Sequence, residues 1–475
     1  MGLTTLVNSA GTIDVSTEGL FPPDIRTALS ADRGYVIVVS GEPGTGKSLF
    51  AQEILREFPS SCAILTDKEG WGEIKTGPSP AITAWKERHF VVDYWRPVAW
   101  SSSHDAPFRQ KINELVADEP GLRDFGIVVV DSWTGLVEPI DSTRRTEILQ
   151  SLVQTAREER KKLVLVADTA KLGGDLSRLN HVADAIIILE KGRTDGRMYR
   201  QLVIEKLRSM PIAQDTFVFT LDRGLFTYVP WYVHQYPPIM IEREPLRDPS
   251  PDRISTGNRS FDTLTKGGFV KGTLSLIEVD NLGAPYLETI YLPFLSNHLQ
   301  LGRPAIVLLP EGWSPERLTN GLSQFVDREI VEKQVVFFGR QALGRKGNVR
   351  AIDDDPWKTL QEIRYEAGQL ERQFGMEVTE LFALDTLENK YGAAHVQELM
   401  AEVTAALPDT KRVTLTILGR QQAIKSTSLC HTIQLRVQEI GGVLTVCGVN
   451  PRTNFFAIRP ILSGGFLDFD LLPIV

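Results

Sequence analysis

The chain has 475 residues, of which 42% are hydrophobic and 24% are charged. This is the composition of a globular protein, and the length suffices for two or three domains, so a fibrous or largely disordered chain is excluded. The net charge is −8, which argues against a broad, sequence-independent grip on nucleic acid because such binding needs a cationic surface.

The cysteines and the apolar segments indicate the compartment. Cys62, Cys430 and Cys447 are too scattered for a disulfide framework or a zinc site. No apolar run approaches the roughly 20 residues of a membrane-spanning helix, and the first residues lack the basic and then apolar segments of a secretory signal. The sequence therefore predicts a cytoplasmic protein with no membrane partner.

The first part of the chain alternates short apolar runs with a stretch of helical period at 49–58. Continuous apolar strands with helices between them are typical of a parallel sheet covered on both faces. Strands closing one edge of this sheet are expected at 198–205 and 217–228. The apolar runs that predict the other strands are residues 35–40, 62–66, 126–130, 163–167 and 185–189.

A proline-rich segment at 235–253 predicts a linker, because it holds five prolines and several charges. The alternation then restarts at a similar spacing, which favours a tandem duplication over two unrelated α/β domains. The expected strands of the second half are residues 274–278, 305–309, 381–385, 413–418 and 443–447. We therefore expect an α/β protein of two tandem domains, 1–236 and 253–475, joined at 237–252, each a mostly parallel twisted sheet flanked by helices.

A glycine-rich segment follows the first expected strand and fits the P-loop pattern G-x-x-x-x-G-K-[ST]. Glycines let the backbone turn tightly so that amide N–H groups face phosphate oxygens, and the helix N-terminus adds positive charge. In such a loop Lys47 reaches the β- and γ-phosphates and the Ser48 hydroxyl ligates Mg²⁺. The sequence thus predicts binding of ATP and Mg²⁺ by Gly41, Glu42, Pro43, Gly44, Thr45, Gly46, Lys47, Ser48 and Leu49.

Two acidic residues complete the predicted site. The apolar run at 127–130 ends in Asp131, which places a carboxylate at the carboxyl edge of the sheet, where open α/β folds bind ligands. Asp131 is expected to hold Mg²⁺ directly or through water, as a Walker B acid does. Hydrolysis also needs a group that orients water, and Glu69, after the second strand, is favoured over Asp67. Solvated charges in a turn are the alternative interpretation of this pair.

The second half lacks an equivalent loop. Pro285 stands where the phosphate-binding lysine would be, and Tyr286 stands where the Mg²⁺ ligand would be. Proline also removes an amide N–H that would face phosphate. Asp385 keeps the Walker B position, but a metal-binding acid without a phosphate cradle has little to hold. The second domain is therefore predicted not to hydrolyse ATP.

With these motifs in place, the chain resembles the RecA-like ATPases and, within them, the KaiC-like family. The resemblance covers about residues 14–230 and, more faintly, 250–475; beyond the P-loop it rests on the segments 181–189, 202–208 and 222–226. It implies a RecA-like core and a homo-oligomeric, commonly hexameric ring with ATP at the subunit interfaces. The proline-led entry into the loop is also similar to that of the archaeal gas-vesicle regulatory P-loop proteins.

The same resemblance implies roles for particular residues. Lys206 and Arg208 would reach the γ-phosphate bound by the neighbouring subunit; the alternative is that both are surface cations on an edge strand. Glu69 falls where the KaiC-like family has a pair of carboxylates, but the first member of the pair is replaced by Lys68. This departure implies slow hydrolysis.

The prediction is a Mg²⁺-dependent ATPase with Glu69 and Lys47 as catalytic residues, acting as a regulatory or signalling ring with an unidentified protein partner. Two alternatives stay open. One is a recombination-type DNA-binding ATPase, which the acidic composition does not favour. The other is a nucleotide-gated scaffold or transcriptional regulator that does not hydrolyse ATP.

Overall fold

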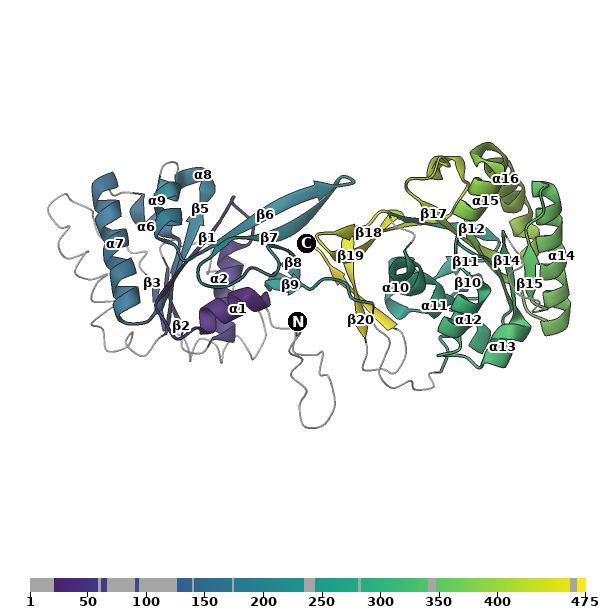
Figure 1. Cartoon of the computed structure of the whole chain (residues 1–475), viewed down its shortest axis with the longest axis horizontal. Coiled ribbons are helices and arrows are strands. Elements are labelled where there is room, and N and C mark those ends of the chain that lie inside the picture. Colours follow the sequence, from purple (N-terminus) through teal and green to yellow (C-terminus); the bar gives the residue numbers. More distant parts are fainter. Residues whose placement is uncertain are drawn as a thin grey trace. The chain divides into compact units, whose positions relative to one another are not determined.

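The protein divides into two compact units, each of which is described separately (Figure 1). The first comprises Met1–Pro230 and Ile474–Val475, and the second comprises Trp231–Pro473. The division lies ahead of the linker expected at 237–252. The computed structural model describes residues 21–58, 61–65, 90–93, 126–138, 141–172, 175–234, 244–280, 283–340, 347–461 and 468–475.

The first unit is built on one sheet, with the strand order β3-β2-β4-β5-β1-β6-β7-β8-β9. The strands from β1 to β6 are parallel, whereas β7, β8 and β9 add to the edge in antiparallel fashion. Their bounds are β1 (Tyr35–Gly41), β2 (Ser61–Leu65), β3 (Phe90–Asp93), β4 (Ile127–Asp131), β5 (Lys162–Asp168), β6 (Ala185–Thr194), β7 (Arg197–Leu207), β8 (Thr216–Thr220) and β9 (Thr227–Val229).

Helices cover both faces of this sheet (Figure 1). Ile37 and Val39 of β1 pack with residues of α1 and α2, whereas Val36 and Val38 pack on the opposite face with residues of α6, α7 and α9. Both faces of β1 are therefore buried, which explains its uninterrupted apolar sequence. The helices are α1 (Pro23–Ser30), α2 (Lys47–Glu57), α6 (Trp133–Val137), α7 (Ser142–Glu158), α8 (Thr169–Leu172) and α9 (Asp175–Val182).

The second unit has a sheet of order β15-β14-β13-β16-β17-β12-β18-β19-β20-β21 and a short β10–β11 ribbon. The strands are β10 (Arg253–Ile254), β11 (Phe269–Val270), β12 (Thr273–Val279), β13 (Ala305–Leu308), β14 (Val335–Gly339), β15 (Val349–Ala351), β16 (Thr379–Ala383), β17 (Val413–Gly419), β18 (Ile433–Ile440), β19 (Val443–Asn450), β20 (Phe455–Ile461) and β21 (Asp468–Pro473). The helices are α10 (Arg259–Leu264), α11 (Ala284–Gln300), α12 (Pro315–Leu322), α13 (Arg328–Gln334), α14 (Pro356–Phe374), α15 (Leu384–Tyr391) and α16 (Ala393–Thr410).

The two sheets share one strand order. Taking β12 in place of β1, the neighbours on one side, β17, β16 and β13, replace β5, β4 and β2, and the neighbour on the other side, β18, replaces β6. The strands from β12 to β18 are likewise parallel, and one apolar core lies on each face. The expected α/β fold, with mostly parallel sheets flanked by helices, is confirmed and is consistent with RecA-like domains.

Two expected strands differ from the structure. Residues 217–228 form β8, a short 3-10 turn (Asp222–Gly224) and β9, because Arg223 and Gly224 take positive φ and break the extended chain. The strand expected at 381–385 ends at Ala383, so Asp385 lies in the first turn of α15. None of the helices that the structure describes has the length and apolarity of a bilayer-spanning segment.

Candidate functional site

The P-loop connects the last residue of β1 to the first residue of α2. Gly44 and Gly46 take φ values of +73° and +104°, a left-handed conformation that other residues adopt only with strain. A Cβ at Gly46 would lie 2.9 Å from Cδ1 of Leu221. Both the turn and the packing therefore require glycine at this position, directly before the N-terminus of α2.

Lys47 lies over the loop that precedes it. Its Nζ donates to the carbonyl oxygens of Gly41 and Glu42, both at 2.8 Å. Burial lowers the pKa of Lys47, and the negative charges of Asp168 and Asp131 act in the opposite direction. The ammonium group is thus close enough to both carboxylates, which end β5 and β4, to be influenced by them.

Asp131 ends β4 at the carboxyl edge of the sheet, and its side chain is buried. The neighbouring Asp168 ends β5, and its N–H donates to the Thr134 hydroxyl at 3.1 Å. The structure therefore brings Lys47 and Asp131 to one edge of the sheet, as the sequence predicts. It adds Asp168 as a second acid at this edge.

The residues present fit a magnesium ion that is held together with a phosphate chain. Among the described residues, no three His, Cys, Asp or Glu side chains are grouped to hold a metal by themselves. Mg²⁺ in phosphate-transfer sites takes one or two protein ligands and completes its shell with phosphate oxygens and water. Asp131, with Ser48 in the first turn of α2, supplies the oxygen donors for such an ion.

The outer side of the loop carries contacts that the sequence did not predict. Lys191 Nζ donates to the carbonyl oxygen of Pro43 at 2.8 Å, and Arg200 Nη1 donates to that of Gly44 at 2.8 Å. Both cations come from the β6–β7 hairpin, about 150 residues away in sequence. No local pattern marks them, because each is one charged residue on a polar stretch beyond the apolar part of its strand.

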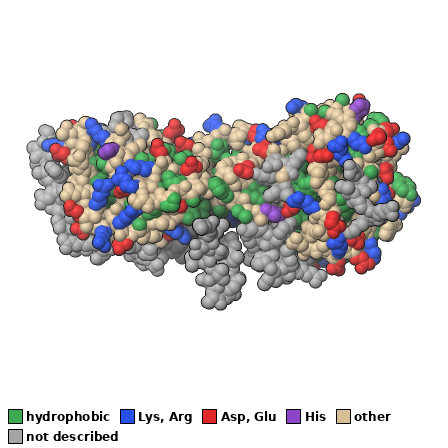
Figure 2. Space-filling view, viewed as in Figure 1, with side chains coloured by type: hydrophobic (Ala, Val, Ile, Leu, Met, Phe, Trp, Pro, Cys, Tyr) green, Lys and Arg blue, Asp and Glu red, His purple; other side chains and the backbone are tan. Residues whose placement is uncertain are grey.

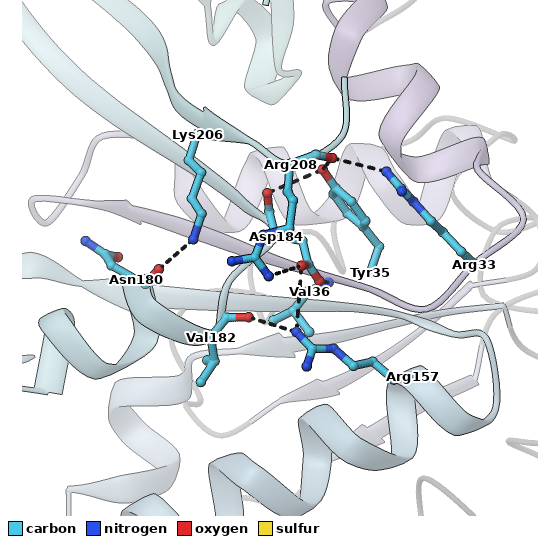
Figure 3. A network of polar contacts seen from close by, with 9 residues as sticks. All are labelled: Arg33, Tyr35, Val36, Arg157, Asn180, Val182, Asp184, Lys206 and Arg208. Carbon is cyan, nitrogen blue, oxygen red and sulfur yellow. Dashed lines mark hydrogen bonds and ion pairs between the residues drawn. The ribbon is translucent and has the colours of Figure 1, made fainter. Parts of the chain in front are cut away.

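Arg208 belongs to a polar network at the amino end of β1, the end opposite the P-loop (the network is drawn in Figure 3). Its Nη1 donates to Asp184 Oδ1 at 3.2 Å, and its carbonyl oxygen accepts the Tyr35 hydroxyl at 2.9 Å. Tyr35 begins β1 and the P-loop follows its last residue, so about 20 Å of strand separates Arg208 from its own loop. The Arg208 side chain is 53% exposed. It is therefore directed away from the P-loop of its own chain and is open to another molecule.

Lys206 and Arg157 belong to the same network (Figure 3). Lys206 Nζ donates to the carbonyl oxygen of Asn180 at 3.0 Å. Arg157 Nη2 lies 3.7 Å from Asp184 Oδ1 and donates to the carbonyl oxygen of Val182. Both cations are therefore held at the amino edge of the sheet by acceptors of their own chain.

Glu69 lies outside the described residues, but the second unit repeats its sequence context. The tripeptide Glu69-Gly70-Trp71 recurs as Glu311-Gly312-Trp313; the first copy follows β2, and the second follows β13, which takes the place of β2 in the second sheet. In the second unit the N–H of Glu311 donates to Asp385 Oδ2 at 2.9 Å, and the Glu311 carboxylate pairs with Arg340. The strand register places Ala383 of β16 where β4 has Asp131, so the prediction that Asp385 keeps the Walker B position is wrong: Asp385 lies two residues further on, in α15. The backbone of Glu311 thus lies at the carboxyl edge of the second sheet, beside an acid that follows the strand.

In the second unit the segment after β12 has the same spacing as the P-loop but not its residues. β1 and β12 both have seven residues, and Lys47 and Pro285 each lie six residues beyond their strand. Glu278, one residue before the end of β12, is buried and pairs with Arg436 at 2.6 Å. Arg436 offsets the charge of this carboxylate, so the assignment of a lost site rests on Pro285 and Tyr286, which replace the lysine and the Mg²⁺ ligand of the P-loop.

Comparisons with known proteins agree with this fold, although no protein-family model matches the chain. The chain is 28% identical to protein GvpD2 of Halobacterium salinarum over 362 residues, 72% of each chain. Its identity to GvpD1 of the same organism is 25% over 333 residues, 66% of this chain and 60% of GvpD1. A UPF0273 protein of Aeropyrum pernix is 26% identical over 221 residues, 41% of this chain and 86% of the relative. The chain is thus related, at modest identity, to the GvpD and UPF0273 proteins.

Proposed function

We propose that the protein binds ATP with Mg²⁺ in its first unit and hydrolyses it slowly, as a KaiC-like member of the RecA-like ATPases. The observation that carries this proposal is the conformation of the P-loop. Two left-handed glycines place the N-terminus of α2 and Lys47 on the loop, at the same sheet edge as Asp131. Such an arrangement presents amide groups and one ammonium to a phosphate chain.

The residues divide the chemistry between them. Lys47 offsets charge on the β- and γ-phosphates, and Ser48 and Asp131 would hold Mg²⁺, which neutralises further phosphate charge when bound. Glu69 would orient the attacking water; support comes from Glu311, which stands in the same tripeptide of the second unit and whose N–H donates to Asp385 at the carboxyl edge of that sheet. Lys68, which replaces the first acid of the family's pair, favours slow turnover.

Lys206 and Arg208 are proposed to act on the nucleotide of a neighbouring subunit. The length of β1 separates them from their own loop, so a role at a phosphate requires a second copy of the chain. Arg208 is half exposed while it pairs with Asp184, so its guanidinium is accessible to a neighbouring subunit. This supports a ring, hexameric by resemblance, with nucleotide between subunits.

The ring is proposed to be regulatory, with nucleotide state controlling assembly or the binding of a protein partner. The second unit has the same strand order but no phosphate cradle, which leaves it free for such docking. Similarity to the GvpD proteins supports regulation over DNA recombination. On the face shown in Figure 2, acidic and basic side chains are interspersed, which also does not favour broad nucleic-acid binding.

The test is the subunit mass in solution with and without ATP and Mg²⁺, together with phosphate release. Arg208→Ala should reduce phosphate release at least about a hundredfold while ATP binding persists, because an arginine supplied in trans contributes that much or more. Arg157→Ala is the matched control, since Arg157 contacts the same Asp184. A monomer unchanged by ATP, or equal loss in both variants, would contradict the trans role.

A further inference from the structure

The β6–β7 hairpin continues past the strand that it shares with the rest of the sheet. β6 pairs with β1 only as far as Leu189, yet β6 runs on to Thr194. Lys191 and Arg200 are direct partners in the β6–β7 ladder. The hairpin therefore carries two neighbouring cations beyond the end of β1, to the point where the P-loop begins.

Both cations bind the P-loop from outside. Lys191 Nζ lies 2.8 Å from the carbonyl oxygen of Pro43, and Arg200 Nη1 lies 2.8 Å from that of Gly44. A Cβ built on Gly44 would lie 3.2 Å from Lys191 Nζ, so a side chain at this position would crowd the cation. A second hydrogen bond holds the Arg200 side chain, whose Nε donates to the backbone oxygen of Val475 at 3.0 Å.

Holding these oxygens orients the amides that follow them. A peptide unit is planar, and its carbonyl oxygen and N–H point in opposite directions. A cation on the Pro43 oxygen therefore directs the N–H of Gly44 to the other side of the loop, and a cation on the Gly44 oxygen fixes the orientation of the next peptide, whose N–H belongs to Thr45. The Thr45 N–H donates within the loop to the Glu42 carbonyl oxygen, with an N···O distance of 3.3 Å, so the Gly44 N–H is the amide of this pair that is left to face a phosphate.

The cations also change the charge around the loop. Burial is the main cause that lowers the pKa of Lys47, and the positive charge of the nearby Lys191 lowers it further. Two carbonyl-bound cations beside the P-loop lysine make a more positive environment for an anion than the lysine alone. A ligand with two or three linked phosphates benefits most, because its charge is concentrated on the phosphate chain.

We propose that Lys191 and Arg200 are positioning residues for the phosphate chain of a nucleoside di- or triphosphate. They hold the Pro43–Gly44–Thr45 backbone in its phosphate-binding form and supply positive charge from behind it. This inference rests on the proposed function, because it assumes that the P-loop binds nucleotide.

The test uses the full chain and measures the dissociation constants of ADP and of ATP with Mg²⁺ by calorimetry. Lys191→Met and Arg200→Gln should each weaken both nucleotides about tenfold, the effect of losing one charge-assisted hydrogen bond. Lys191→Arg and Arg200→Lys should keep most of the affinity, because they retain the charge and a donor. Arg193→Met is the matched control: Arg193 lies two residues from Lys191 on the same strand and is exposed.

The outcomes separate the two proposals. If the wild type binds ATP, Lys47→Ala does not, and Lys191→Met and Arg200→Gln bind within twofold of wild type, the positioning role is wrong and the proposed function stands. If the wild type binds neither nucleotide, both are wrong. Loss of affinity in Arg193→Met as well, or in the charge-keeping variants to the same degree, would assign the effect to disturbance of the hairpin and overturn the inference. Unfolding midpoints without nucleotide verify that the variants fold.

Discussion

Asp184 and Arg208 are joined at the amino edge of the first sheet, where Arg208 Nη1 donates to Asp184 Oδ1 at 3.2 Å. The other carboxylate oxygen of Asp184 accepts the backbone N–H of Val36 at 3.1 Å. The Asp184 side chain is buried, so one carboxylate serves a main-chain donor of the central strand and a half-exposed guanidinium together.

Replacing this carboxylate is expected to destabilise the first unit. Asp184→Ala should lower its free energy of unfolding by about 2–4 kcal/mol, because a buried N–H of Val36 loses its acceptor and Arg208 loses its counter-charge. Asp184→Asn keeps an acceptor for Val36 and should cost about 1 kcal/mol. Urea unfolding followed by a probe in the first unit checks the order; equal midpoints for the two variants would contradict it.

Gly46→Ala is expected to abolish nucleotide binding. The added methyl group would lie 2.9 Å from Leu221 Cδ1 at a φ of +104°, so the loop must shift, at a cost of about 1–3 kcal/mol in stability. Gly224→Ala is the control, because Gly224 has a φ of +72° with nothing near its Cβ position. It should cost about 1 kcal/mol and leave ATP affinity unchanged. Calorimetric titration and thermal unfolding of both variants measure this.

ATP with Mg²⁺ is expected to stabilise only the first unit. At a concentration one hundred times the dissociation constant, a ligand adds about 2.7 kcal/mol to the unit that binds it. Hydrogen exchange of the full chain should therefore slow in β1 and α2 and stay unchanged in β12 and α11. Slower exchange in α11 would contradict the assignment of Pro285 and Tyr286 as features of a lost site.

His298 is expected to make the second unit sensitive to acid. It is fully buried, its Nε2 contacts the Ser255 carbonyl oxygen at 2.9 Å, and Arg303 Nη1 lies 2.7 Å from its Nδ1. Burial, together with the charge of Arg303, lowers its pKa to about 3. Above the ordinary histidine pKa of about 6.5, both folded and unfolded states are neutral at this residue and no stability is lost.

Between about pH 6.5 and pH 3 the unfolded chain binds a proton that the folded chain does not, so stability falls as pH falls. The slope from this residue is about 1.4 kcal/mol for each pH unit. His298→Asn, which keeps a donor and an acceptor, should remove that part of the slope. The comparison is the free energy of unfolding of wild type and variant from pH 7 to pH 4. Parallel pH profiles would contradict the assignment.

The fold could be predicted from the sequence because its central strands are buried on both faces. Continuous apolar runs gave β1 and β5 to within one residue at each end. The runs did not give the far half of β6, since the residues after Leu189 are polar and half exposed. Nor did they give Asp385 its place in a helix, because the apolar run continues through Leu384 across the strand end.

The P-loop could also be predicted from the sequence, because its glycines and Lys47 follow a fixed local spacing that the backbone geometry of the loop requires. Lys191 and Arg200 could not be found in this way. Their relation to the loop arises from the pairing of β6 with β1 and of β7 with β6, which brings together segments about 150 residues apart. Only the structure of the sheet shows that Lys191 and Arg200 contact the P-loop.

β7 and the residue that directly follows it make two contacts at opposite ends of the strand. Arg200 touches the P-loop of its own chain, and Arg208 lies at the other edge of the sheet, eight residues or about 25 Å further along. In the proposed ring each such strand would span two nucleotides, its own at one end and a neighbour's at the other. Such a strand would link neighbouring sites, so turnover in this ring is expected to depend on ATP concentration with a Hill coefficient above one.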